Sequence, residues 1–150
     1  MSELRELYQQ VILDHNRSPH NFGKLENADR SQEGYNPLCG DHLQVHLKLD
    51  GDTIQDISFE GSGCAISKAS ASLMTAALKG TSRSQAEQLF ADFHALVTTP
   101  SDTPVNTDKV GKLAVLAGVR EFPMRVKCAT LAWHTMKAAL DGDTEAISTE

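Results

Sequence analysis

Three cysteines, Cys39, Cys64 and Cys128, are the residues of this chain best suited to chemistry. Cys39 lies in NPLCGD (residues 36–41), where proline and glycine indicate a loop. Cys64 follows Gly-Ser-Gly at the expected start of a helix, where free N–H groups and partial positive charge stabilise a thiolate. An odd, scattered set does not match a disulfide framework, so the thiols are expected to stay free, bind metal or react.

A zinc site would use all three cysteines and one further residue. Zinc takes four tetrahedral ligands from thiolate, imidazole and carboxylate groups. Asp41 and His42 are the nearest candidates for the fourth. Side chains alternate in an extended segment, which sets Asp41 on the side of Cys39 and His42 on the other. Asp41 is therefore the predicted fourth ligand, although a tight turn at Gly40 would remove this reason.

The metal interpretation has a plainer alternative, because closely paired cysteines are absent and a cysteine is often a small buried apolar residue. Cys128 shares a helical stripe with Leu131 and Ala132.

If the site exists, three thiolates and one carboxylate give Zn²⁺ a formal net charge of about −2. Cys39, on a glycine-flanked loop, would leave the metal at less conformational cost than a cysteine within a helix. Such a site suits a thiolate that departs, reacts and returns.

The strands that position these residues follow from hydrophobic periodicity. Apolar and polar residues alternate over residues 43–49, which predicts a half-buried strand. An Asp-Gly pair at residues 50–51 predicts a hairpin turn to a return strand around residues 57–59. Ile54 is out of step with that strand and predicts a bulge or an early turn.

Helical periodicity indicates several helices. The first is expected to begin at Ser2 and to stop near Ser18-Pro19, and the others are expected over residues 64–80, 84–97, 109–119 and 122–140. Ser84 and Glu87 are expected to form the capping box of the third. Residues 16–38 lack periodicity and are expected to be loop, and the last eight residues are expected to be frayed. The order of helix, antiparallel strands and further helices predicts an α+β fold, with helices against one face of a small antiparallel sheet.

Length and composition restrict the class of protein. The chain has 150 residues, 40% hydrophobic and 23% charged, which fits a single domain over residues 1–150. The net charge of −6, without a run of lysine or arginine, argues against nucleic acid or an anionic membrane as a partner. The sequence shows no transmembrane stretch or signal peptide, so a cytoplasmic protein is expected. No apolar surface stripe is left over, which favours a monomer.

Four stretches of the chain form a recognisable set. They are LYQQVILDHNRSPHNFG, NPLCGD, FEGSGCAISKASASLM and RVKCATLAW. Together they resemble the IscU-like proteins of iron–sulfur cluster biogenesis, most closely the SufU branch, and the resemblance covers residue 4 to about residue 140. It implies the IscU/SufU-like two-layer sandwich, with a small antiparallel sheet and helices packed on one face. It also implies a function in iron–sulfur cluster assembly.

The resemblance further implies a ligand set and a reaction. In the SufU branch, the positions matching Cys39, Asp41, Cys64 and Cys128 bind one zinc ion. The cysteine matching Cys39 accepts persulfide sulfur from a pyridoxal-phosphate-dependent cysteine desulfurase of the SufS type, whose histidine displaces that cysteine from zinc. The implied protein is a zinc-dependent sulfurtransferase that activates the desulfurase and passes sulfur to a downstream iron–sulfur scaffold.

Three departures from IscU scaffolds favour the SufU branch. Lys127 precedes Cys128 where those scaffolds usually carry histidine, and FPMRVK at residues 122–127 replaces their LPPVK chaperone motif. The segment between Cys64 and Cys128 is also longer. The alternative is an IscU-type scaffold that assembles and transfers a [2Fe–2S] cluster on the same residues, which thiolate ligation also allows. A purely structural zinc ion is a further alternative.

Three other residues have two interpretations each. Arg125 matches a SufU-branch arginine near the site, or is a surface salt-bridge residue. Lys127 either favours the thiolate of Cys128 or is simply solvated. His15 resembles part of the family's N-terminal Asp-His pattern, but a histidine at a helix end is expected to be structural rather than a ligand.

Overall fold

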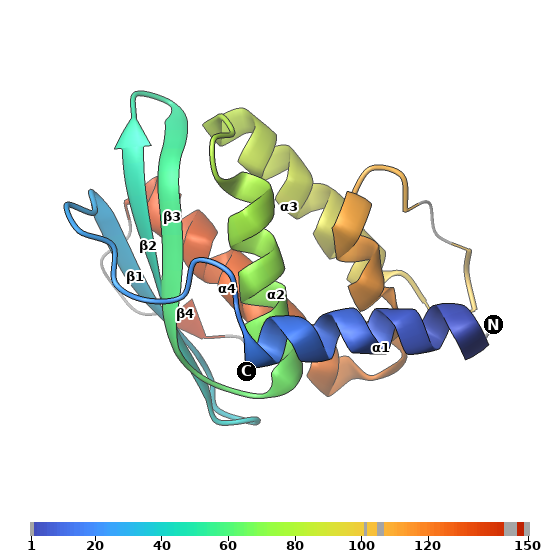
Figure 1. Cartoon of the computed structure of the whole chain (residues 1–150). Coiled ribbons are helices and arrows are strands. Elements are labelled where there is room, and N and C mark those ends of the chain that lie inside the picture. Colours follow the sequence, from blue (N-terminus) through green and yellow to red (C-terminus); the bar gives the residue numbers. More distant parts are fainter. Residues whose placement is uncertain (1, 101, 105–106, 143–146, 149–150) are drawn as a thin grey trace.

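The structure has one layer of strands and one of helices (Figure 1). It is a computed structural model that describes residues 2–100, 102–104, 107–142 and 147–148. The elements are α1 (Ser2–Arg17), β1 (Arg30–Asn36), β2 (Asp41–Asp50), β3 (Thr53–Ser62), α2 (Ala65–Leu78), α3 (Arg83–Thr98), the 3₁₀ helix η1 (Gly111–Glu121), α4 (Pro123–Asp141) and β4 (Ile147–Ser148). The predicted α+β fold, with helices on one face of a small sheet, is confirmed.

The sheet has the strand order β3-β2-β1-β4. β1, β2 and β3 pair antiparallel, whereas the two-residue β4 joins β1 in parallel. The predicted hairpin turn between β2 and β3 is confirmed, and Gly51 takes a φ of +60° in it. The register shifts between Lys48 and Leu49, opposite Ile54, which confirms the predicted irregularity.

The predicted loop over residues 16–38 is wrong at residues 30–36, which form β1. The residues of β1 that face the helices are Gln32, Gly34 and Asn36, all buried. None of the three is an apolar residue of the kind that marks a strand, so the usual alternation is missing. Pairing with β2 and packing against α4 make this segment a strand in spite of its composition.

The predicted start of α3 is also wrong. Ser82 and Gln85, not Ser84 and Glu87, form the capping box. The two patterns overlap in sequence, and the backbone decides between them: Ile54 N–H donates to Thr81 O (2.8 Å) and so fixes where the helix begins.

The chain end differs from its prediction too. Residues 147–148 are not frayed, because they pair with β1, and the rest of the last eight residues lie outside the described part of the chain.

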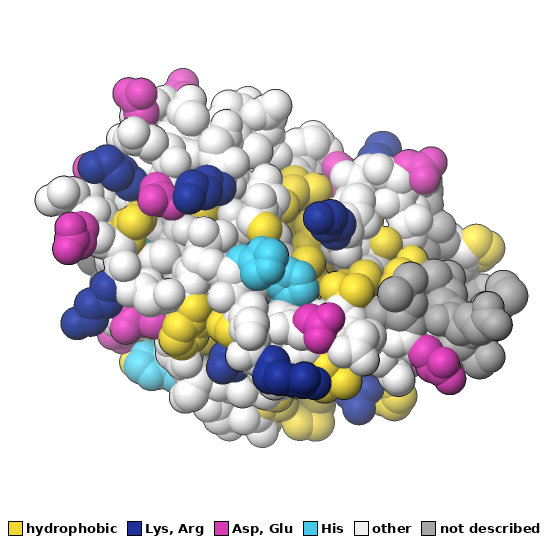
Figure 2. Space-filling view, viewed as in Figure 1, with side chains coloured by type: hydrophobic (Ala, Val, Ile, Leu, Met, Phe, Trp, Pro, Cys, Tyr) yellow, Lys and Arg dark blue, Asp and Glu magenta, His cyan; other side chains and the backbone are white. Residues whose placement is uncertain are grey.

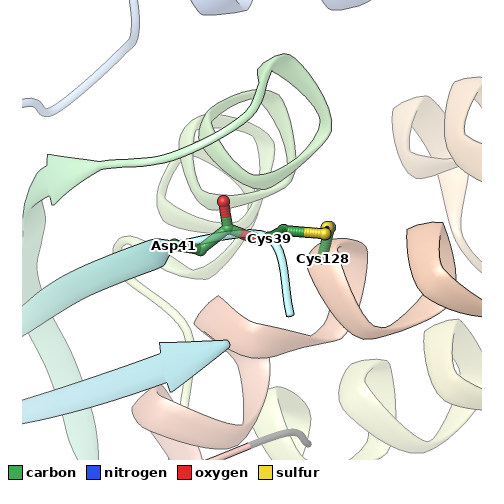
Figure 3. Close-up of side chains that lie close together, drawn as sticks. All are labelled: Cys39, Asp41 and Cys128. Atoms are coloured by element: carbon green, nitrogen blue, oxygen red, sulfur yellow. The ribbon is translucent and has the colours of Figure 1, made fainter. Parts of the chain in front are cut away.

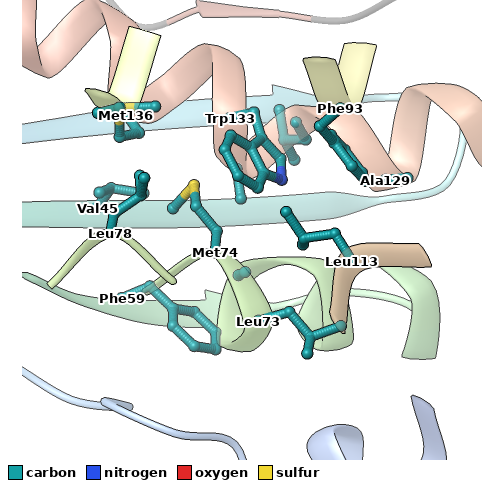
Figure 4. Close-up of a cluster of buried hydrophobic side chains, with 14 of the residues drawn as sticks. Val45, Phe59, Leu73, Met74, Leu78, Phe93, Leu113, Ala129, Trp133 and Met136 are labelled. Carbon is teal, nitrogen blue, oxygen red and sulfur yellow. The ribbon is translucent and has the colours of Figure 1, made fainter. Parts of the chain in front are cut away.

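The core fixes α4, and α4 carries Cys128. Inward side chains of β2 and β3 meet α2 and α4 in a continuous buried cluster (Figure 4). Trp133 of α4 lies at its centre with no exposed surface. Its ring stacks on Phe93 of α3 with centroids 4.9 Å apart, and its Nε1–H donates to Ser70 Oγ of α2 at 3.2 Å. These contacts hold three helices in a fixed relation to the sheet.

The surface carries charges of both signs. Figure 2 shows basic side chains interspersed with acidic ones on one face, rather than gathered into a basic stripe. At the end of α1, His15 Nδ1 lies 2.6 Å from Ser72 Oγ of α2, which fits the expected structural role of this histidine. Within the described ranges, every helix is too short or too polar to cross a bilayer.

Candidate metal centre

The four predicted ligand residues meet at one end of the sheet. Cys39 lies in the turn between β1 and β2, and Asp41 is the first residue of β2. Cys64 follows β3 and is the N-cap of α2, and Cys128 lies in α4. The paired ends of the three strands and the packing of α4 therefore bring together residues that are up to 89 positions apart in the chain.

Cys39, Asp41 and Cys128 form a tight cluster, in which the two cysteine side chains meet (Figure 3). One ligand atom from each of the three lies within 4.8 Å of the other two. The Sγ atoms of Cys39 and Cys128 are 3.2 Å apart. Cys64 lies beside this cluster, and its Sγ is 4.0 Å from Asp41 Oδ2. All three cysteines are free thiols.

Asp41 is placed by hydrogen bonds and strand pairing, not by simple alternation along an extended chain. Gly40 has a φ of +72° within a turn, so the expected reason for the position of Asp41 does not apply. Asp41 is only 2% exposed. Its Oδ1 accepts from the Cys64 N–H at 2.8 Å, and its Oδ2 accepts from Asn36 Nδ2 at 3.3 Å. His42, the other candidate, is turned outward and stacks on Tyr35.

Cys64 occupies the helix N-terminus that the sequence predicts. Its Sγ accepts from the Ser67 N–H at 3.4 Å, which makes it the side-chain cap of α2. Gly63, just before it, passes so close to the site that a Cβ atom there would lie 2.7 Å from Asp41 Oδ1. Nothing in the sequence alone singles out Gly63, because the restriction comes from a strand that is distant in sequence.

Cys128 differs from Cys39 in its surroundings. Cys39 is exposed, whereas Cys128 is 2% exposed. Burial raises the pKa of the Cys128 thiol, and hydrogen bonds with Cys39, Cys64 and Asp41 raise it further. A metal ion would therefore have to displace a proton in order to bind this sulfur.

Lys127 and Arg125 lie outside the cluster. The raised pKa of the Cys128 thiol does not support a thiolate-favouring effect of Lys127. Arg125 stands three residues before Cys128, with its guanidinium 4.5 Å from the centre of the Phe122 ring. It lines a pocket of about 660 Å³ between α1 and η1. Among the described residues it has no ion pair, so its interpretation as a surface salt bridge is not supported.

The chain matches a family model over most of its length. Residues 7–141 match the model described as the NifU-like N terminal domain. The chain belongs to this family. Among curated relatives, it is 41% identical over 140 residues to the iron–sulfur cluster assembly scaffold protein IscU of Streptococcus pyogenes, covering 93% of this chain and 86% of that protein.

Two further proteins resemble the chain closely. The zinc-dependent sulfurtransferase SufU of Bacillus subtilis is also 41% identical, over 137 residues that cover 91% of this chain and 90% of that protein. The crystal structure of a proposed iron–sulfur cluster assembly scaffold protein for the SUF system from Fervidobacterium islandicum superposes with a TM-score of 0.80 at 34% identity, covering 87% of this chain and 94% of that one. Overall identity therefore does not separate the scaffold from the sulfurtransferase.

Proposed function

We propose that the chain is an iron–sulfur cluster assembly protein of the IscU/SufU type that acts as a zinc-dependent sulfurtransferase. The observation that carries this proposal is the convergence of Cys39, Asp41 and Cys128 within 4.8 Å, with Cys64 4.0 Å from Asp41. Three thiols and one carboxylate form a donor set that zinc binds. The named SufU and IscU relatives, each 41% identical, support the same class of protein.

The spacing of the donors fits zinc. Two sulfurs of a tetrahedral site with Zn–S bonds of about 2.3 Å lie about 3.8 Å apart. The observed distance between Cys39 Sγ and Cys128 Sγ is 3.2 Å, so a modest opening of the pair would suffice. Cys39, Asp41, Cys64 and Cys128 would hold the ion, which when bound would keep the thiols deprotonated at neutral pH.

Cys39 is the sulfur acceptor in this proposal because it is the exposed member of the set. Its thiolate attacks the outer sulfur of a persulfide on a pyridoxal-phosphate-dependent cysteine desulfurase. A new S–S bond forms at Cys39 and the S–S bond of the donor breaks, so the donor leaves as a thiolate and no external oxidant is consumed. A downstream iron–sulfur scaffold then receives the sulfur from Cys39.

Three of the four proposed ligand residues are held in fixed positions. Asp41 and Cys128 are each 2% exposed, and Cys64 is tied to the first turn of α2. Cys39 instead lies in a turn next to Gly40, so it can move while the other three residues stay in place. This difference supports Cys39 as a mobile sulfur carrier and the other three residues as fixed ligands.

The choice of sulfur relay over cluster assembly rests on particular residues. Lys127 stands where IscU scaffolds usually carry histidine, and residues 122–127 depart from their chaperone motif. The second candidate is an IscU-type scaffold that binds a [2Fe–2S] cluster on the same four residues. It is favoured by the 41% identity to the Streptococcus pyogenes IscU and by the thiolate-rich donor set.

Metal analysis and desulfurase turnover, measured on the same fresh protein, test the proposal. Sulfur relay predicts about one tightly bound zinc per chain and a Cys39→Ser variant that folds but no longer stimulates a SufS-type desulfurase under a mild reductant. Matched iron and labile sulfide in protein purified without oxygen would instead identify the scaffold. Full stimulation by Cys39→Ser would show that any zinc is purely structural.

A further inference from the structure

Asn36 contacts three of the four proposed ligand residues. Its Nδ2 lies 3.3 Å from Asp41 Oδ2 and 3.4 Å from Cys128 Sγ. Its backbone carbonyl accepts from the Cys39 N–H at 3.2 Å. Asn36 is the last residue of β1, paired with Asp41 in register, so one side chain links the hairpin to α4.

The carboxamide of Asn36 contacts the proposed ligands through Nδ2 but leaves its buried Oδ1 without a partner among the described residues, which is unfavourable for folding. The residue has no exposed surface, and within the described part of the chain its Oδ1 has no hydrogen-bond partner. A buried carbonyl oxygen without a partner costs stability, which a leucine of similar shape would avoid. The residue is therefore better explained by what Nδ2 contacts than by packing.

The two contacts of Nδ2 also fix the orientation of the amide. A carboxylate and a thiolate are both acceptors, and the NH₂ group has two protons, one for each. The opposite orientation would set Oδ1 against the Asp41 carboxylate, and Oδ1 could pair with Cys128 only while that residue keeps its proton. The orientation in the structure is therefore the one that supports deprotonated ligands, at the cost of leaving Oδ1 unpaired.

We propose that Asn36 is a positioning residue of the metal centre, an inference that rests on the proposed function. Its Nδ2 holds Asp41 and Cys128 in place, and its carbonyl anchors the turn that carries Cys39. If Cys39 left a bound metal to accept sulfur, these contacts would keep two of the remaining ligands at their positions. Partners that orient metal ligands in this way commonly change metal affinity by 10–100-fold.

The test compares Asn36→Leu with the unaltered chain. Leucine keeps the branched shape and the backbone hydrogen bond but removes both N–H donors. We expect zinc affinity, measured by competition with a chromophoric chelator, to fall about 10–100-fold. We expect the melting temperature of the metal-free chain to change little, because removing the unpaired Oδ1 offsets the loss of the N–H donor to the buried Asp41 carboxylate. In the cobalt(II)-loaded chain, the thiolate-to-cobalt absorption band should shift, because Cys128 loses an N–H donor.

Ser58→Ala is the matched control, because Ser58 Oγ is also buried and has no hydrogen-bond partner among the described residues, but belongs to β3 outside the centre. It should leave zinc affinity and the cobalt spectrum unchanged. If Asn36→Leu does not fold, Asn36→Ala removes the same donors without added bulk and should show the same loss of affinity.

Three outcomes overturn the inference, and they are distinguishable. If the unaltered chain binds zinc but Asn36→Leu binds it equally well, Asn36 has no positioning role and the proposed function stands. Lower stability of the metal-free variant with unchanged affinity would make Asn36 structural only. If the unaltered chain itself takes up no zinc, the proposed function fails and this inference fails with it.

Discussion

Gly63→Ala should damage the centre through one added methyl group. An alanine Cβ would lie 2.7 Å from Asp41 Oδ1, about 0.7 Å inside the 3.4 Å at which ordinary contact begins. Displacing Oδ1 by that amount would stretch its 2.8 Å hydrogen bond from the Cys64 N–H to about 3.5 Å, beyond a useful length. A hydrogen bond to a charged group contributes about 1.5–3 kcal/mol, so we expect a free energy of unfolding lower by about 1–3 kcal/mol.

The same displacement moves a proposed metal ligand, so zinc affinity should fall about 10–100-fold. Denaturant titration of the metal-free chain measures the first effect, and a chelator competition measures the second. Gly118→Ala in η1 is the matched control, because a Cβ there would meet no atom of the described residues within 4 Å. It should be neutral or slightly stabilising. Wild-type stability and wild-type zinc affinity in Gly63→Ala would refute the account of how Asp41 is held.

Two further predictions concern the fold. Gly34→Ala should lower the free energy of unfolding by about 1–3 kcal/mol, because the added Cβ would overlap Thr135 Oγ1 of α4. Thr135→Ala in the same chain should recover part of that loss. Equal stability of Gly34→Ala and the unaltered chain would contradict the close packing of β1 on α4. Burial, and then His94, lowers the pKa of His134 below 6.5, so the unfolded chain binds a proton that the folded chain does not, and stability should fall as the pH drops through 6.5. As the pH is lowered from about 7 to about 5, the denaturation midpoint should decrease less steeply in His134→Gln than in the unaltered chain. The same pH dependence in both chains would contradict this role of His134.

The sequence predicts the parts of the fold that have ordinary hydrophobic patterns. Alternation over residues 43–49 predicts β2, and its apolar positions Leu43, Val45 and Leu47 are all fully buried. β1 is not predicted from the sequence because the residues that face the helices are not the apolar residues that mark a strand. Gly34 lets α4 approach closely, and Asn36 faces the proposed metal ligands.

The candidate site shows the same division between motif and geometry. Cys39, Asp41, Cys64 and Cys128 can be chosen from residue type and from resemblance to a family, and the structure brings them together. The alternation of side chains expected to place Asp41 beside Cys39 does not apply, because the chain turns at Gly40. Asn36 and Gly63 cannot be recognised from sequence, because their importance depends on contacts between β1, β2, α2 and α4.

The most direct measurement is mass spectrometry of the chain after incubation with a SufS-type cysteine desulfurase and free cysteine, without reductant. The account predicts the added mass of one sulfur atom on the peptide that contains Cys39, and none on the peptides that contain Cys64 or Cys128. The added sulfur should disappear from the Cys39→Ser chain. Sulfur found on Cys64 or Cys128, or no added sulfur while the desulfurase turns over, would contradict the assignment of Cys39 as the acceptor.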